Sequence, residues 1–191
     1  MLNDQRVDEV LAFWFGSEPG AVRAEWFRKD LAFDALIGAR FGPLVDAAVA
    51  GEIDAWMASP LGSLARLIVL DQFTRNTRRD SALAYAGDAR ALAAAQAIVR
   101  AGWDLDYSGV QRWFCYLPFE HAEDLAEQQA SLRLFGALAK DQPVLASALD
   151  YAQRHHAVIE RFGRFPHRNA ALGRTSTPQE ASYLLQPGAG F

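Results

Sequence analysis

A stretch near the C-terminal end of the chain combines positive charge with apolar residues. Residues 161–174 read RFGRFPHRNAALGR, with four arginines, one histidine and no acidic residue. Guanidinium groups form paired, charge-assisted hydrogen bonds with carboxylates and phosphates. Burial of the interleaved Phe, Pro and Leu side chains would hold these arginines against the protein body, where each needs a partner. The stretch predicts either a site for a small anion or arginines that pair with the protein's own carboxylates.

A second group of polar residues continues an apolar stripe in LARLIVLDQFTRN, residues 64–76. Side chains three and four positions apart share a helix face. One face then carries Leu64, Ile68, Asp71 and Arg75, with Gln72 and Asn76 alongside. The alternative is that Asp71 and Arg75 form a surface ion pair, which would contribute only about 0.2–0.5 kcal/mol.

Three histidines fall on or near apolar faces of two further helical segments. In PFEHAEDLAEQQASLRLF, His121 and Gln128 share a face with leucines and should point inward. The acids of this segment form a neighbouring row that could equally be a solvated helix face: Glu120, Glu123, Asp124 and Glu127. In LASALDYAQRHHAVIERFG, His155 and His156 lie near the buried side, where a hydrogen-bonded core histidine is more common than a catalyst.

The elements that position these residues are predicted to be helices only, because helix caps recur and alternating strand-like runs are missing. We expect eight to nine helices in stacked antiparallel hairpins within one domain, residues 1–191. Asn3 should cap the first helix, Gly16 should end it, and Gly42 with Pro43 should break the one that starts at Asp30. The further expected helices are one from Ser59–Pro60 to about Asn76, one opened by Asp80 or Ser81 and closed by Gly102, those over 109–116, 118–139 and 144–162, and one after Thr177.

Composition narrows the class of protein. The 191 residues are 51% hydrophobic and 22% charged, which is typical of a folded domain. The net charge of -4 argues against a surface made for nucleic acid or an anionic membrane. A single cysteine, Cys115, cannot form an internal disulfide, and no apolar run has the length of a membrane span. We expect a soluble, cytoplasmic protein.

Four sequence blocks resemble the bacterial DUF924 family, a domain of unknown function. They are VLAFWFG, LDQFTRN, PFEHAED and HHAVIERFGRFPHRNAALGRTSTPQE, and the resemblance extends over essentially the whole chain. It implies a tetratricopeptide-like helical fold and no particular substrate. The motif positions include His155 but not His156, and Thr74 stands where many members carry proline.

The leading functional hypothesis is a pocket that binds a small phosphate or carboxylate, including the carboxylate of a peptide C-terminus. Its ligand-binding residues would be Asp71, Gln72, Arg75, Asn76, Gln128, Arg164, Arg168, Asn169 and Arg174. A protein partner is compatible with this hypothesis, whereas nucleic acid and membrane partners are not expected.

Two alternatives remain open at this point. One is a hydrolase or transferase that uses arginine stabilisation and acid–base chemistry at His121, Glu123, His155 and His167. The other is a purely structural network that pins the last loop to the helices. The i,i+2 spacing of His121 and Glu123 does not suit a metal site, so no metal or cofactor is predicted.

Overall fold

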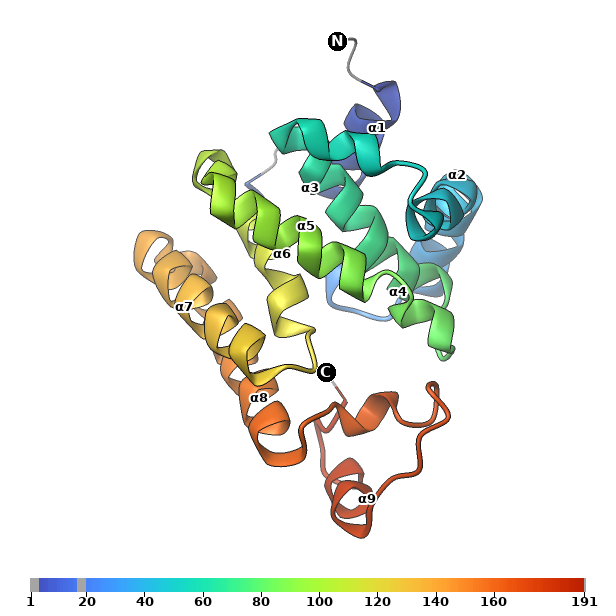
Figure 1. The fold of residues 1–191 in the computed structure, drawn as a ribbon, viewed down its shortest axis with the longest axis vertical. Coiled ribbons are helices and arrows are strands. Elements are labelled where there is room, and N and C mark those ends of the chain that lie inside the picture. The colour runs from blue at the N-terminus through green and yellow to red at the C-terminus, as the bar shows by residue number, and fades with distance from the viewer. Residues whose placement is uncertain (1–3, 17–19, 191) are drawn as a thin grey trace.

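The computed structural model describes residues 4–16 and 20–190, and the regular elements in these ranges are all helices or helical turns (Figure 1). The all-α prediction is confirmed. The helices are α1 (Gln5–Phe15), α2 (Leu31–Ala50), α3 (Pro60–Ile68), α4 (Thr74–Thr77), α5 (Asp88–Ala101), α6 (Gly109–Glu120), α7 (Leu125–Asp141), α8 (Ser147–Phe162) and α9 (Pro178–Leu184). None of the described helices is long and apolar enough to cross a membrane.

Most helix boundaries follow the local capping signals. The Ser59 side chain accepts a hydrogen bond from the Gly62 amide and Pro60 opens α3, while Thr177 and Glu180 form a capping box at α9. Gly16 follows the last residue of α1 as predicted. The predicted cap Asn3 lies outside the described residues, and the observed N-cap of α1 is Asp4.

Three predicted boundaries were wrong. The helix expected to open at Asp80 or Ser81 starts only at Asp88, after a separate 3-10 turn at Ala82–Tyr85. Helix α2 continues through Pro43, because Pro43 and Ala39, whose carbonyl loses its amide partner, are both exposed residues. The predicted helix 118–139 is two helices. Helix α6 runs through Pro118 to Glu120, and α7 starts only after residues 121–124, which we call the 121–124 corner.

The main core extends from α1 to α8 and contains a cluster of aromatic rings. Trp14 contacts Phe73 and Phe114 edge to face, with ring centroids 5.6 and 5.4 Å apart. A smaller apolar cluster of Val158, Ile159 and Phe165 lies where α8 meets the last loop. In Figure 1, α9 and this loop occupy the end of the molecule opposite α1. A tetratricopeptide-like arrangement is compatible with this packing and stays a prediction.

A π-helical turn, η3 (Val69–Phe73), joins α3 to α4 in one continuous helix. Such turns are rare and are often found at functional sites. Gly87 lies directly before α5 and packs so closely against this turn that a Cβ atom would be 2.1 Å from the Leu70 carbonyl oxygen. The close approach places the start of α5 beside Asp71, which η3 carries.

Candidate functional site

A cavity of about 290 Å³ lies between η3, the start of α5, the 121–124 corner and the short turn η7 (Pro166–Arg168). One part of its wall is apolar and consists of Ala89, Leu92, Pro118 and Ala122. The polar part consists of Asp71, Asp88, His121, Glu123, Asp124 and Arg168. Segments far apart in the sequence therefore meet around one hollow, and of the predicted site residues Asp71, His121, Glu123 and Arg168 border it.

The Asp71 carboxylate forms the floor of the polar part and is fully buried. One oxygen lies 2.8 Å from Nδ1 of His121 and 3.0 Å from Nη1 of Arg75, and the other accepts a hydrogen bond of 2.6 Å from Gln72. Burial alone would raise the pKa of Asp71, but the charge of Arg75, with His121, outweighs burial and holds the pKa below its usual range. Asp71 is therefore an ionised acceptor.

This pairing fixes the tautomer of His121. Since Asp71 is an acceptor, Nδ1 of His121 carries the hydrogen and Nε2 carries the lone pair. Burial lowers the pKa of His121, and the charge of Asp71 does not fully offset that effect. The ring borders the cavity, and among residues 4–16 and 20–190 Nε2 has no hydrogen-bond partner. A neutral imidazole with its basic nitrogen unoccupied thus lies at the cavity wall.

Two arginines and Asp88 extend the network from Asp71 to η7. One oxygen of Asp88 accepts from Nη2 of Arg75 and from Nη1 of Arg168, each at 3.1 Å, and the other lies 2.9 Å from Nη1 of Arg75. Nη2 of Arg168 donates to the carbonyl oxygen of His121 at 3.0 Å. The guanidinium of Arg168 also stacks between Tyr85 and Phe165, with its carbon 4.7 and 4.6 Å from the two ring centroids.

Some N–H groups of Arg168 have no hydrogen-bond acceptor among the described residues. A guanidinium has five N–H groups, and the bonds to Asp88 and His121 use one hydrogen on each terminal nitrogen. Its Nε is buried, and no described residue accepts a hydrogen bond from it. The whole residue is 6% exposed and borders the cavity. Arg168 is thus a buried cation at the cavity whose hydrogen-bonding capacity is only partly used.

Glu120 and His155 form a second buried pair behind His121. The His155 Nδ1 atom lies 3.1 Å from a carboxyl oxygen of Glu120 and 2.9 Å from the carbonyl oxygen of Tyr151, and its ring centroid is 6.2 Å from that of His121. Burial, strengthened by Asp71, raises the pKa of Glu120 well above its usual value. Burial also lowers the pKa of His155 to about 3, so both shifts favour the uncharged form of each partner.

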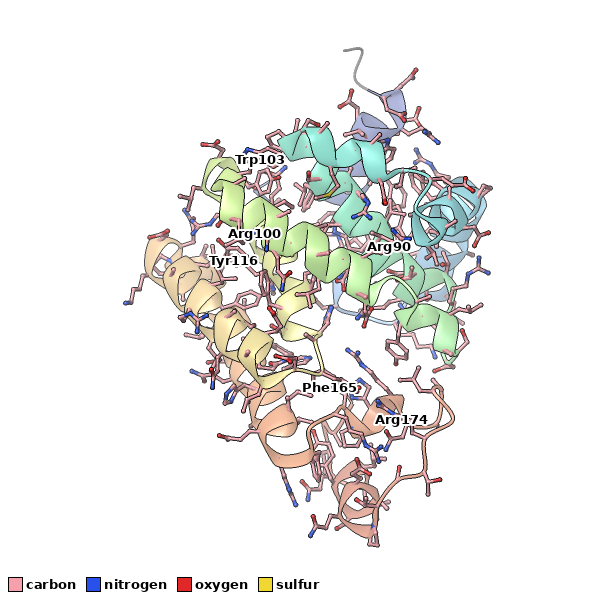
Figure 2. All side chains as sticks on the ribbon, viewed as in Figure 1. Arg90, Arg100, Trp103, Tyr116, Phe165 and Arg174 are labelled. Atoms are coloured by element: carbon pink, nitrogen blue, oxygen red, sulfur yellow. The ribbon has the colours of Figure 1, made fainter. Side chains whose placement is uncertain are left out.

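Glu123 connects the 121–124 corner to the loop after α8. Arg174 donates two hydrogen bonds to its carboxylate, at 2.6 and 2.9 Å, and the Phe165 amide donates a third at 2.7 Å. Arg174 also donates to the Phe165 carbonyl oxygen, and Figure 2 shows these two residues close together near the end of α6. Burial raises the pKa of Glu123, but the Arg174 and Phe165 hydrogen bonds outweigh it and the pKa is lowered.

Several predicted ligand-binding residues form hydrogen bonds or ion pairs with other residues of the protein and do not border the cavity. Arg164 pairs with Glu180 at 2.6 Å, and the Asn169 amide donates to Ser176 and accepts from Arg174. The remaining predicted residues outside the cavity wall are Gln72, Arg75, Asn76, Gln128, His155, His167 and Arg174.

The amides among these residues have clear structural tasks. Gln128 donates to the carbonyl oxygens of Glu120 and Ala122, at 2.6 and 2.8 Å, which satisfies the open C-terminal end of α6 and shapes the 121–124 corner. Asn76 donates to Asp34 on α2, away from the cavity.

His167 is partly buried against Phe165, and burial, with Arg168, lowers its pKa to about 4.

Sequence reasoning did not single out Asp88 or the apolar wall. Asp88 is one acid at the start of an alanine-rich segment, and its only signal is the preceding Gly87, which allows the close contact with η3. Within the described part of the chain, no three His, Cys, Asp or Glu side chains are grouped to hold a metal ion.

Comparisons with known proteins agree with the motifs. The sequence profile of the family described as "Bacterial protein of unknown function (DUF924)" matches residues 10–188. The chain belongs to the DUF924 family. A solved structure of a protein of unknown function from Agrobacterium tumefaciens is 40% identical, with a TM-score of 0.83, and the match covers 95% of this chain and 97% of that one. A search of curated proteins found no match. The DUF924 resemblance and the helical fold it implies are thus confirmed.

Proposed function

We propose that this DUF924 protein binds a small organic molecule in the cavity and holds a carboxylate or carbonyl oxygen of it at Arg168. One observation carries the proposal: Arg168 is 6% exposed, borders the cavity and keeps N–H donors without a described acceptor. A buried donor without an acceptor costs about 1–3 kcal/mol, and a ligand oxygen would recover part of that cost.

The charges around the cavity limit the chemical class of ligand that it can bind. Three acids of the wall, Asp71, Asp88 and Glu123, are balanced by Arg75, Arg168 and Arg174. The fourth, Asp124, is exposed and caps α7. A phosphate dianion would meet these carboxylates with no excess of positive charge. A neutral carbonyl compound or a monocarboxylate is therefore favoured over the phosphate that the arginine-rich loop alone suggests.

Size and polarity set a second limit. The volume of about 290 Å³ corresponds to roughly ten water molecules at about 30 Å³ each, which suits a small metabolite. The apolar wall of Ala89, Leu92, Pro118 and Ala122 would contact a short hydrocarbon part. A peptide C-terminus fits less well, because most of a peptide would have to lie outside.

Calorimetric titration with acetate, propanoate, benzoate and inorganic phosphate tests the proposal. We expect a monocarboxylate to bind more tightly than phosphate, and Arg168→Lys to weaken that binding about tenfold, which corresponds to about 1.4 kcal/mol. The matched control is Arg164→Lys, because Arg164 pairs with Glu180 outside the cavity wall. Absence of binding by all three monocarboxylates, or equal binding by the Arg168→Lys variant, would contradict the proposal.

A further inference from the structure

The cavity wall places a base next to the proposed oxygen site. Nδ1 of His121 is held by the buried Asp71 carboxylate at 2.8 Å, and Nε2 has no partner among the described residues. Arg168 donates to the backbone carbonyl of the same His121, both residues border the cavity, and the charge of Arg168 acts on the His121 ring. A carboxylate that fixes the tautomer, a basic imidazole nitrogen and a neighbouring oxygen-binding cation are the parts of a general-base site.

We propose that His121 is the general base of a hydrolytic reaction in which water attacks a small carboxylic ester. This inference rests on the proposed function, because the ester carbonyl oxygen occupies the oxygen site at Arg168. The cavity wall contains no Ser, Thr, Cys or Lys side chain from the described residues. In this proposal His121 acts on water as its base, so water is the nucleophile and no covalent acyl-enzyme forms.

The reaction balances with water as the only co-substrate. Nε2 of His121 takes a proton from water while the water oxygen bonds to the ester carbon, and the carbonyl π electrons move to the oxygen at Arg168. When the C=O bond re-forms, the bond to the alcohol oxygen breaks and the leaving alkoxide takes the proton from Nε2. The products are a carboxylic acid and an alcohol, and His121 returns to its neutral form.

Each neighbouring charge has a part in this step. Asp71 is a positioning residue, since it keeps Nε2 available and stabilises the imidazolium that forms. Arg168 stabilises the negative charge that develops on the carbonyl oxygen. The charged and titratable groups around His121 are Asp71 on η3, Arg75 on α4, Asp88 on α5, Glu123 and Asp124 in the 121–124 corner, His155 on α8, and His167 and Arg168 on η7.

Hydrolysis of 4-nitrophenyl acetate, followed by release of nitrophenolate, tests this inference. We expect His121→Asn to lower kcat/KM about 100-fold, the lower range of general-base contributions. His156→Asn is the matched control, because His156 lies one residue beyond the buried His155 on α8 and does not border the cavity; its kcat/KM should equal that of the parent. The rate should rise with pH and level off near neutrality, since the neutral imidazole is the active form.

The outcomes separate this inference from the proposed function. If the parent hydrolyses the ester no faster than His121→Asn, the inference is overturned. If propanoate or another monocarboxylate still binds in that case, the proposed function stands alone. Asp71→Asn provides a second readout, because loss of the fixed tautomer should lower kcat much more than it changes KM. An Asp71→Asn protein that folds with unchanged kcat would contradict the positioning role.

Discussion

Replacement of Asp71 by asparagine should remove the charge on which the polar network depends. The side chain is fully buried and contacts His121, Arg75 and Gln72 at 2.8, 3.0 and 2.6 Å. Removal of one member of a buried ion pair costs about 3–5 kcal/mol, because the partner is left buried without compensation. Arg75 keeps its contacts with Asp88, so we expect the lower end of this range, about 3 kcal/mol.

Urea unfolding at pH 7 measures this loss directly. The midpoint should fall with an unchanged m-value, and the melting temperature should drop by roughly 6–12 °C for a chain of this size. The matched control is Asp46→Asn. Asp46 also pairs with an arginine, Arg78, but its side chain is 69% exposed, and such surface pairs contribute about 0–1 kcal/mol.

The losses of unfolding free energy in the two variants together test whether the buried Asp71 charge stabilises the fold. If Asp71→Asn lowers the free energy of unfolding by less than about 1 kcal/mol, as expected for Asp46→Asn, then the buried ion pairs of Asp71 do not stabilise the fold. The linked pH effect has a defined sign. The folded pKa of Asp71 is lowered, so its contribution is full above the unfolded pKa of about 3.9 and is lost as pH falls through the folded pKa.

Three further predictions concern packing, the last loop and the second buried pair. Gly87→Ala should destabilise the protein by about 1–3 kcal/mol in urea unfolding, because the new Cβ would be 2.1 Å from a backbone oxygen. Gly136 in α7 has open space around it, so Gly136→Ala should stabilise the protein by about 0.5–1 kcal/mol. Equal effects of the two substitutions would contradict the packing argument. Glu123→Gln should speed limited trypsin cleavage within residues 164–174, because it weakens the contacts of this side chain with Arg174 and the Phe165 amide. Cleavage of the variant at the parent rate would show that these contacts do not order the loop. The folded pKa of Glu120 is raised, so its contribution to stability is full below its unfolded pKa of about 4.3 and is lost as pH rises through the folded pKa, an effect that the lowered pKa of His155 offsets below about pH 6.5. The parent should therefore lose stability as pH rises above about 6.5, by at most about 1.4 kcal/mol per pH unit. Glu120→Gln should abolish this decline, and a decline of the same size in both proteins would contradict the assignment to Glu120.

Features set by neighbouring residues could be predicted from the sequence. The caps at Ser59 and Thr177 depend on side chains within three positions of the amides that they accept from, so local pattern suffices. The same holds for the inward position of Asp71, which follows from helical spacing. Pro43 shows the limit of such rules, because exposure of a helix face decides whether the missing hydrogen bond is costly.

The partners of the arginines could not be predicted in the same way. The sequence indicates that Arg164, Arg168 and Arg174 need acceptors, but Glu180, Asp88 and Glu123 are brought to them only by the packing of α9, α5 and the 121–124 corner. An arginine that serves a ligand and one that serves an internal carboxylate have the same local sequence. Asp88 went unrecognised for the same reason, since its role arises from the contact of Gly87 with η3.

The state of His121 is the most direct test of the central claim that a fixed imidazole faces a ligand cavity. The chain has four histidines, so nitrogen NMR of histidine-labelled protein can follow each ring. We predict that His121 carries its hydrogen on Nδ1 and that added propanoate shifts its Nε2 resonance while His156 stays unchanged. A His121 ring protonated on Nε2, or one that does not respond to any monocarboxylate or small ester, would contradict the account.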